Sequence, residues 1–256
     1  MRGFECVLQY PREELLRLGF PHRGRWNEDL FAVSRPIVLE LGCGRGEYTV
    51  GLAQADPTRN FVGIDIKGAR MWTGAKQVEE SGMDNAKFLR CEIENLSQFY
   101  GPGEVDEIWI TFPDPQMKKT RKRLTSTRFL KMYREMLGPD GIVNLKTDSP
   151  FLYEYTRRLV ELNKLPVVAA TSDLYVERGA RGAGRVDVPD SDVPDSDEEN
   201  DKLAKARAIQ TYYEQQWLSR GKSIKLISFR LPEDVELQEP REDDIEKDDY
   251  RAIPRF

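Results

Sequence analysis

The sequence predicts an α/β fold: a mainly parallel sheet of about seven strands with helices on both faces. Short apolar segments alternate with segments that read as helices along most of the 256 residues. Repeated β–α units of this kind build parallel sheets covered on both sides. A glycine-rich turn follows the first predicted strand, and an aspartate ends the second. In open α/β sheets such groups lie where ligands bind, at the carboxyl ends of the strands.

The elements of the first half follow one another in strict alternation. Pro36–Leu41 is a continuous apolar strand, and the glycine-rich turn after it opens a helix over 47–55. The second strand ends at Asp65, and the helix behind it stops at Gly82, a residue type that commonly ends helices. A third strand, a short helix and a fourth strand follow. We expect these elements at 60–65, 68–81, 86–91, 94–100 and 105–111.

The second half repeats the alternation and closes on a strand. Gly138-Pro139 stops a helix that starts at Thr127, because proline cannot continue a helix. A fifth strand, a helix and a sixth strand come next, and a long amphipathic helix precedes the last strand. We expect these elements at 127–137, 141–146, 151–162, 165–174, 202–220 and 223–230.

Three segments lie outside this pattern. Residues 1–35 form an expected N-terminal arm with one short helix at 12–18, either solvated or in contact with RNA through its basic end beside Trp26. Residues 36–232 form the expected α/β domain. Within it, the acidic insertion 179–201 carries a tandem Val-Pro-Asp-Ser-Asp repeat and is expected to be disordered. Residues 233–256 form an acidic tail, which we expect to be loosely held.

The net charge of −5 is unevenly distributed. Residues 187–201 hold eight acidic residues and no basic ones, and residues 233–249 hold ten acidic and two basic ones. The rest of the chain is therefore basic, which favours a polyanionic partner. No apolar run approaches the roughly 20 residues that cross a bilayer, and no signal peptide is expected, since Arg2 and Glu5 interrupt the N-terminus. We expect a cytoplasmic protein, monomeric or homodimeric, with no membrane partner.

Cysteine and histidine usage excludes several chemistries. Cys6, Cys43 and Cys91 are scattered without metal-ligand spacing, so we expect free thiols, no disulfide and no metal. His22 is the single histidine, which excludes a metal site built from several histidines and disfavours a Ser-His-Asp triad.

The first turn has the spacing G-x-G-x-G, with glycines at 42, 44 and 46. Glycines let the backbone approach a ligand closely at a helix N-terminus. The dinucleotide fingerprint would need a glycine where Glu47 stands, and this acid opposes a pyrophosphate, so a hydride-transferring dehydrogenase is disfavoured. Asp65, about 20 residues on, is placed for ribose hydroxyls. The alternative is a turn that serves strand–helix packing alone.

Acids around this turn suit a ligand with a ribose and a cationic group but no phosphate, as in S-adenosylmethionine. Here the chain resembles the class I S-adenosylmethionine-dependent methyltransferases, which have a Rossmann-like fold. The resemblance implies that S-adenosylmethionine is the cofactor and that Glu92 follows the third strand near the adenine; surface charge is the alternative for Glu92. The implied cofactor residues are Glu40, Gly42, Gly44, Gly46, Asp65, Glu92 and Asp114.

A second motif narrows the resemblance. Phe112-Pro-Asp114-Pro-Gln-Met-Lys118-Lys119 follows the fourth strand, and Arg121-Lys-Arg comes directly after it. With Lys146-Thr-Asp148 and Thr211-Tyr-Tyr-Glu214, this sequence is similar to the tRNA (guanine-N7-)-methyltransferases over residues 36–230. Those enzymes modify a guanine in the variable loop of tRNA, so tRNA is the implied partner. The chain departs from the family's pattern at Gln116, where tryptophan is usual, and in a basic stretch about two residues shorter without the usual Arg-His pair.

The resemblance implies a role for each matched residue. Asp114 lies at the reaction centre. The implied substrate residues are Lys118, Asp148, Thr211, Tyr212, Tyr213 and Glu214, and the implied phosphate contacts are Lys119, Arg121, Lys122 and Arg123. The chemistry agrees, because guanine N7 has an in-plane lone pair and no proton, so alignment rather than a general base supplies the rate. A fixed carboxylate would stabilise the positive charge that methylation leaves on the purine. Asp148 or Glu214 could accept hydrogen bonds from guanine N1 and N2.

Other interpretations stay open at this point. The basic cluster 118–123 could be a solvated loop, Asp148 could cap the helix that follows it, and Tyr212, Tyr213 and Trp217 could be core residues. The rival functions are an amino-group methyltransferase of nucleic acid and a non-catalytic RNA-binding module on the same fold. The first would carry D-P-P-Y where this chain has Asp114-Pro-Gln-Met. The second is opposed by the intact glycines and acids of the first turn.

Overall fold

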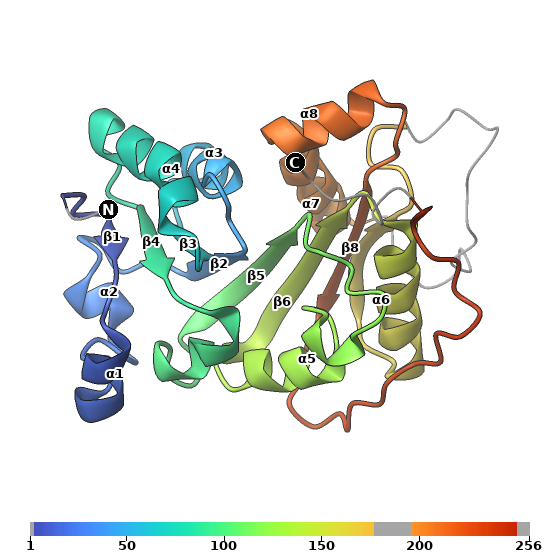
Figure 1. Ribbon diagram of the computed structural model, residues 1–256, viewed down its shortest axis with the longest axis horizontal. Helices are drawn as coiled ribbons and strands as arrows, with labels where there is room; N and C mark the ends of the chain where they lie inside the picture. The colour runs from blue at the N-terminus through green and yellow to red at the C-terminus, as the bar shows by residue number, and fades with distance from the viewer. Residues whose placement is uncertain (1–2, 177–195, 250–256) are drawn as a thin grey trace. The chain divides into compact units, whose positions relative to one another are not determined.

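The computed structural model describes residues 3–176 and 196–249. The chain divides into two compact units, the first formed by residues up to Thr111 with Lys131–Val143, and the second by Phe112–Leu130 with the chain from Asn144 onward. Eight strands are ordered β1-β4-β3-β2-β5-β6-β8-β7 (Figure 1). The α/β class with a mainly parallel sheet is confirmed, with one strand more than the seven that the sequence predicts.

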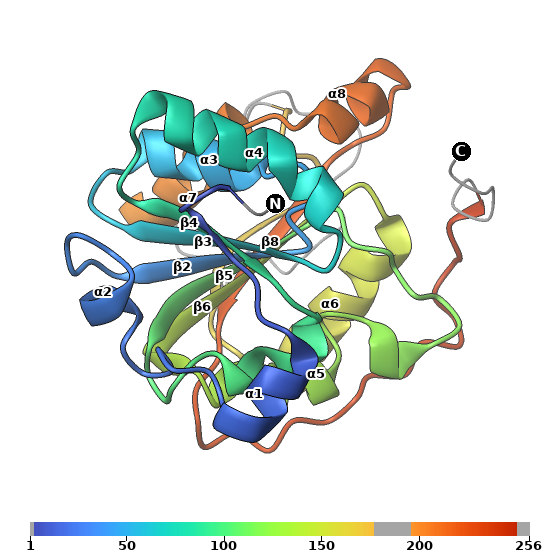
Figure 2. The same ribbon diagram turned by 60° about the vertical axis from the view of Figure 1, so that its left-hand side comes forward.

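The first unit holds five parallel strands: β1 (Val7–Leu8), β2 (Ile37–Leu41), β3 (Asn60–Asp65), β4 (Ala86–Arg90) and β5 (Val105–Thr111). Every residue of β2 is buried, which explains why it reads as a continuous apolar run rather than an alternating one. Two helices, α3 (Glu47–Ala55) and α4 (Gly68–Ser81), lie side by side over these strands (Figure 2). A 3₁₀ helix, η1 (Ile93–Gln98), joins β4 to β5.

Two parts of the N-terminal segment, at residues 6–8 and 20–31, are packed into the first unit, so the expectation of a solvated arm is wrong there; the helix at 12–18 between them is exposed as expected. Val7 and Leu8 pair in parallel with Phe88 and Leu89 of β4. Short helices α1 (Arg12–Leu18) and α2 (Trp26–Asp29) follow. The Trp26 side chain is fully buried, donates from Nε1 to the Phe99 carbonyl at 2.9 Å and stacks on Tyr100. A two-residue strand has no periodicity that a sequence pattern could reveal.

The second unit holds β7 (Val167–Thr171) antiparallel to β8 (Lys225–Arg230), and β6 (Leu137–Thr147) runs through both units. Its helices are α6 (Pro150–Leu162), α7 (Asp197–Ala208) and α8 (Tyr212–Ser219), with a 3₁₀ turn, η2 (Thr120–Lys122), while α5 (Thr127–Arg134) is divided between the two units. The predicted helix at 127–137 ends three residues early. The strand after it starts at Leu137 rather than Gly141, because Gly138-Pro139 lies in extended backbone that proline tolerates at a strand start.

The predicted helix 202–220 is two helices. Thr211 interrupts it: the Thr211 side chain accepts a hydrogen bond from the Glu214 backbone N–H at 3.3 Å and caps α8. The first helix begins at Asp197, inside the segment expected to be disordered, with Ser196 as its cap. Residues 177–195, which include most of the acidic insertion and its repeat, lie outside the described residues.

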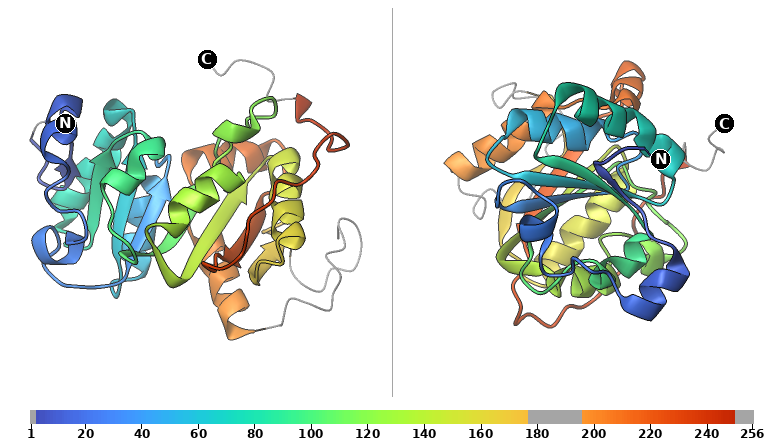
Figure 3. Two further views of the ribbon diagram at one scale, coloured as in Figure 1. Left: turned by 90° about the horizontal axis from the view of Figure 1, so that it is seen from below. Right: turned by 90° about the vertical axis from the view of Figure 1, so that its left-hand side faces the viewer.

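The acidic tail is part of the second unit over residues 233–249, which corrects the expectation of a loosely held segment. Leu237 and Ile245 are buried, and so is the Asp248 side chain. Figures 1 and 3 show this segment, in red, running past α5 and α6. Among the helices of the described residues, none combines the length and the apolar character that crossing a bilayer requires.

Candidate functional site

The glycine turn of the first unit folds over the end of β3. The backbone N–H groups of Gly42 and Cys43 both donate to the Ile64 carbonyl, at 2.8 and 2.9 Å. Gly42, Gly44 and Gly46 have φ values of 77°, 55° and 77°, a region that side chains disfavour. A Cβ on Gly46 would lie 2.6 Å from the Phe88 ring, whereas a Cβ on Gly42 would meet nothing within 4 Å. Packing thus explains the third glycine, but the first borders open space that a ligand can use.

Asp65 shapes this turn from the end of β3. One carboxylate oxygen accepts from the Gly44 N–H at 3.0 Å and the other from the Lys67 N–H at 2.7 Å. The residue is partly exposed, so lone pairs remain for a ligand. Glu92 is exposed after β4 and accepts a hydrogen bond from Asn95. Because β2, β3 and β4 are parallel neighbours, the turn, Asp65 and Glu92 share one edge of the sheet.

Glu40 differs from the other acids, since its carboxylate is buried. It accepts from the Thr49 N–H at 2.8 Å, from the Thr49 hydroxyl, and from the Thr111 hydroxyl at 2.7 Å. These bonds join the end of β2 to the first turn of α3 and to the end of β5. Burial raises the pKa of Glu40 from 4.5 to about 7, against the effect of its hydrogen bonds. The carboxylate therefore supports the glycine turn from behind.

The loop that carries Asp114 begins the second unit. The Phe112 N–H donates to the Lys146 carbonyl at 2.8 Å. Phe112 and Gln116, on either side of Pro113-Asp114-Pro115, have φ values of 48° and 49°. A non-glycine residue in this region costs about 1–3 kcal/mol, so the surrounding structure must hold it there. Asp114 itself is exposed, with one oxygen accepting from the Gln116 N–H at 2.9 Å.

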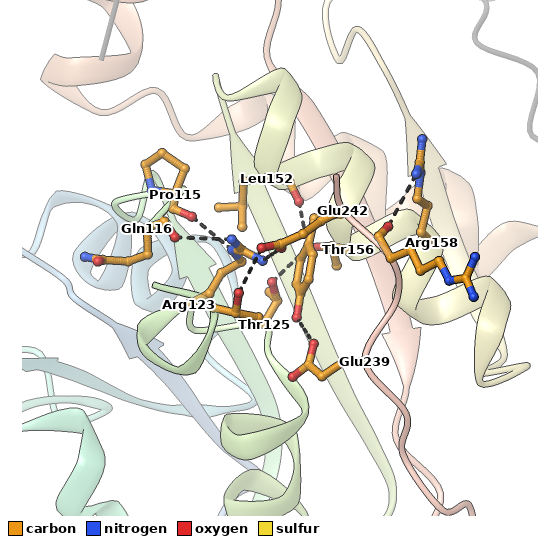
Figure 4. Close-up of polar contacts among 12 residues, drawn as sticks. Pro115, Gln116, Arg123, Thr125, Leu152, Thr156, Arg158, Glu239 and Glu242 are labelled. Atoms are coloured by element: carbon orange, nitrogen blue, oxygen red, sulfur yellow. Dashed lines mark hydrogen bonds and ion pairs between the residues drawn. The ribbon is translucent and has the colours of Figure 1, made fainter. Parts of the chain in front are cut away.

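Arg123 holds this loop from inside and does not face solvent. Its guanidinium donates to the carbonyls of Pro115 and Gln116 at 3.1 and 3.2 Å and to Glu242 at 2.5 Å (Figure 4). It lies 4.0 Å from the ring centroid of Tyr155, a contact that favours a buried cation. The side chain is 0 % exposed, so the prediction that Arg123 contacts a tRNA phosphate is wrong. Its basic neighbours differ, because Lys118, Lys119, Arg121 and Lys122 are not buried.

Asp148 follows β6 and is buried. It does not cap the next helix, contrary to one of the two interpretations open from the sequence. Ser149 is the N-cap of α6, and its hydroxyl accepts from the Leu152 N–H at 3.0 Å.

A buried ion pair that the sequence did not reveal connects β6 to α8. Lys146 Nζ lies 2.8 Å from the Glu214 carboxylate, and both side chains are 0 % exposed. The ammonium also donates to the carbonyls of Ala206 and Ile209, and the Tyr175 hydroxyl donates to Glu214 at 2.7 Å. Both Glu214 oxygens thus accept bonds from inside the protein. A lysine near the end of a largely buried strand was the signal available in the sequence for this pair.

The aromatic pair at the start of α8 faces outward. Tyr212 and Tyr213 are 50 % and 42 % exposed, and their ring centroids lie 6.0 Å apart, edge to face. The interpretation of these tyrosines as core residues is therefore wrong. Trp217, which the sequence also suggests for the core, is only half-buried. Thr211 is buried as the cap of the helix.

The described residues hold no group of three or more His, Cys, Asp or Glu side chains arranged for a metal ion. All three cysteines are free thiols, as predicted. Cys43 lies in the glycine turn, but burial raises the pKa of its thiol well above the usual value, so it is inert as a nucleophile.

Comparison with known proteins places this geometry in context. Residues 34–176 match a family described as "Putative methyltransferase". A tRNA (guanine-N(7)-)-methyltransferase of Porphyromonas gingivalis is 55 % identical over 258 residues, covering 100 % of this chain and 96 % of the relative. The protein of the same name from Bacteroides thetaiotaomicron is 49 % identical over 255 residues, covering 100 % and 92 %. That from Bacillus subtilis is 33 % identical over 156 residues, covering 60 % and 73 %.

Among solved structures, "Structure of an antibiotic related Methyltransferase" superposes with a TM-score of 0.52 at 14 % identity, covering 88 % of this chain and 96 % of the other. This likeness concerns the fold alone.

The buried Glu40 predicts a pH dependence of stability. The folded protein holds the Glu40 proton more tightly than the unfolded chain does, so its stability contribution is present below about pH 4.5 and lost as pH rises to about 7. The free energy of unfolding of the wild type should therefore fall by an amount on the order of 3 kcal/mol over this range because of Glu40, and Glu40→Gln should lack this fall. Urea unfolding of both proteins at pH 4.5 and 7.5 measures this change in the free energy of unfolding. Equal declines in the wild type and the variant would show that Glu40 titrates normally.

The Lys146–Glu214 pair predicts a strong coupling energy. Lys146→Met leaves the Glu214 carboxylate buried without its counterion and should lower the free energy of unfolding by about 3–5 kcal/mol. Adding Glu214→Gln should restore part of this loss, because the isolated charge is gone. As a control, Lys76→Met breaks the exposed 3.5 Å pair with Glu80 and should cost about 0.5 kcal/mol or less. Urea unfolding of Lys146→Met, Glu214→Gln, the double variant and Lys76→Met tests this, and strictly additive losses would contradict the coupling.

Proposed function

The chain belongs to the tRNA (guanine-N(7)-)-methyltransferase family, and we propose on that basis that it transfers the methyl group of S-adenosylmethionine to N7 of a guanine in the variable loop of tRNA. The observation that carries the proposal is the likeness over the whole chain to the Porphyromonas gingivalis enzyme, 55 % identical. The rival functions, an amino-group methyltransferase and a non-catalytic RNA-binding module, have no comparable support. Cytoplasmic location and a monomeric or homodimeric state belong to the same proposal.

The first unit offers residues suited to the cofactor. When bound, S-adenosylmethionine supplies a methyl group on a positively charged sulfur. The open space beside Gly42 would let the cofactor approach the backbone of the left-handed turn closely. Asp65 has lone pairs left for the ribose hydroxyls. Glu92 would lie near the adenine. Glu40 would act by holding the turn, because its carboxylate already accepts bonds from Thr49 and Thr111.

The second unit offers residues suited to the guanine. Since N7 needs no deprotonation, the chain has only to orient the base and to stabilise charge. The exposed Asp114 carboxylate would stabilise the positive charge on the methylated purine. Tyr212 and Tyr213 expose ring faces on which a base can stack. Glu214, with both oxygens occupied, would position α8, and Asp148, which is buried after β6, would likewise act from inside the protein rather than accept directly from guanine N1 and N2.

The accessible basic residues complete the proposed substrate surface. Lys118, Lys119, Arg121 and Lys122 would hold tRNA phosphates, which gives affinity without reading sequence. Because Gln116 stands where the family usually has tryptophan, one aromatic stacking surface beside Asp114 is missing. The two tyrosines of α8 provide aromatic surfaces elsewhere in the same unit.

Removing the charge of Asp114 tests the proposed reaction centre. Asp114→Asn keeps an acceptor for the Gln116 N–H, so the loop should persist, but the turnover of tRNA should fall by about 100-fold or more. Cofactor affinity should stay within about twofold, measured by calorimetry. Asp234→Asn, an exposed acid of the same unit, is the matched control. Transfer of labelled methyl groups, followed by nucleoside mapping, gives the rate and the product. Near-normal turnover by Asp114→Asn would place the reaction centre elsewhere.

The basic surface predicts a salt-dependent affinity for tRNA. Replacing Lys118, Lys119, Arg121 and Lys122 by glutamine should weaken binding and lower the slope of log K against log salt by roughly 0.7–0.9 for each phosphate that is no longer neutralised. Lys164→Gln with Lys247→Gln, two exposed lysines outside the cluster, is the control. Filter binding between 50 and 200 mM salt, about the range over which such effects are large, measures the slope. An unchanged slope would show that the cluster is not a phosphate surface.

A further inference from the structure

Four carboxylates of the acidic segment 237–248 meet backbone or side-chain donors of earlier elements: Asp244 pairs with Arg158 of α6, and the other three belong to Glu239, Asp248 and Glu242. Glu239 accepts from the N–H of Thr127, the first residue of α5, at 2.9 Å and from its hydroxyl at 2.7 Å. Asp248 accepts from the Phe151 N–H, in the first turn of α6, at 3.1 Å. The first N–H groups of a helix have no partner within it, so both acids act as caps supplied from a distant segment. The segment is therefore built into the second unit at specific points.

The carboxylate of Glu242 reaches the loop that carries Asp114. One oxygen accepts from the Thr120 hydroxyl at 2.9 Å and the other from Arg123 at 2.5 Å. The same guanidinium donates to the carbonyls of Pro115 and Gln116 (Figure 4). Those two residues directly follow Asp114, and Gln116 is one of the two left-handed residues of the loop. Arg123 thus joins the acidic segment to this strained backbone.

The chemistry of this contact requires both partners. A guanidinium presents donors in several directions within one plane, and a lysine ammonium cannot reproduce that fork. A fully buried cation also needs a counterion, because an unpaired charge in the interior is strongly unfavourable. Glu242 is that counterion. Glu239 adds support, since it accepts a hydrogen bond from the hydroxyl of Tyr155, whose ring lies against the guanidinium.

We propose that Arg123 and Glu242 are positioning residues for methyl transfer: Glu242 fixes the guanidinium, and the guanidinium fixes the two carbonyls that follow Asp114. This inference rests on the proposed function. In this arrangement the acidic segment acts on methyl transfer through the Asp114 loop, because Glu239, Glu242 and Asp248 accept hydrogen bonds from donors inside the second unit.

Kinetics can separate positioning from binding. Glu242→Gln and Arg123→Lys should each lower kcat by 10- to 100-fold, since small misplacements of a catalytic group have effects of about this order. The KM for tRNA should stay within about twofold of the wild type. Lys122→Gln, a change at the exposed neighbour of Arg123, should do the reverse and act on KM. Glu246→Gln is the matched control for Glu242, because it removes an exposed acid four residues on in the same segment.

Hydrogen exchange gives a readout that does not depend on turnover. The Gln116 N–H bonds to Asp114 and the Lys119 N–H bonds to the Gln116 carbonyl, so both amides report the order of the loop. They should exchange faster in Glu242→Gln and Arg123→Lys, while amides of the glycine turn keep wild-type rates. Stoichiometric cofactor binding, at about one per chain, shows that each variant is folded. Thr120→Val, which removes only the hydroxyl bond to Glu242, replaces any variant that fails this check.

The outcomes are distinguishable. Reduced kcat with faster exchange at the two loop amides supports the proposal. Wild-type kcat and wild-type exchange in folded Glu242→Gln and Arg123→Lys overturn it. If the wild-type protein itself transfers no methyl group to tRNA, the proposed function fails, and exchange at Gln116 and Lys119 still decides whether this pair orders the loop.

Discussion

The Asp114 loop and the acidic segment of the second unit are held together by the buried cation Arg123. Arg123 joins three parts of the chain that are distant in sequence: the Asp114 loop, the aromatic face of α6 and the acidic segment that contains Glu242. An arginine suits this position because its planar group can stack and donate in several directions at once. Removal of the Glu242 charge would leave the guanidinium buried without a counterion, which is what makes the contact specific.

Buried ionisable side chains hold other loops of the protein in a similar way. Glu40 joins β2, α3 and β5 behind the glycine turn, and Lys146 with Glu214 joins β6 to the junction of α7 and α8. Glu40 and Lys146 are buried near the end of a strand, where the chain leaves the sheet and enters a loop. Apolar packing alone sets no particular conformation for such loops, whereas a buried charge is satisfied only when several specific donors or acceptors surround it. Buried ionisable side chains therefore hold in place the loops that carry the more exposed residues Asp65 and Asp114.

Sequence patterns predicted the parts that local physics determines. The buried strands and the glycine turn follow from apolar runs and φ preferences, and these predictions are confirmed. The burial of Arg123 was missed because a run of basic residues normally faces solvent, and its counterion lies 119 positions away. The Thr211-x-x-Glu214 signature of a helix cap was present, but it was interpreted as a substrate element alone. The acidic tail was misjudged for the same reason as Arg123, since charge patterning cannot identify distant partners.

The contact between Arg123 and Glu242 also bears on the order of folding. Contacts between residues far apart in sequence form late, because the entropy of closing a long loop has to be overcome first. The pairing of β2 with β3 and the glycine turn rely on closer neighbours, with Val38 opposite Phe61 and Glu40 meeting Thr49 nine positions away. The left-handed residues of the Asp114 loop are held in place only after the acidic segment has packed against the loop. We therefore expect a refolding chain to regain the β2–β3 pair and the glycine turn before it regains an ordered Asp114 loop.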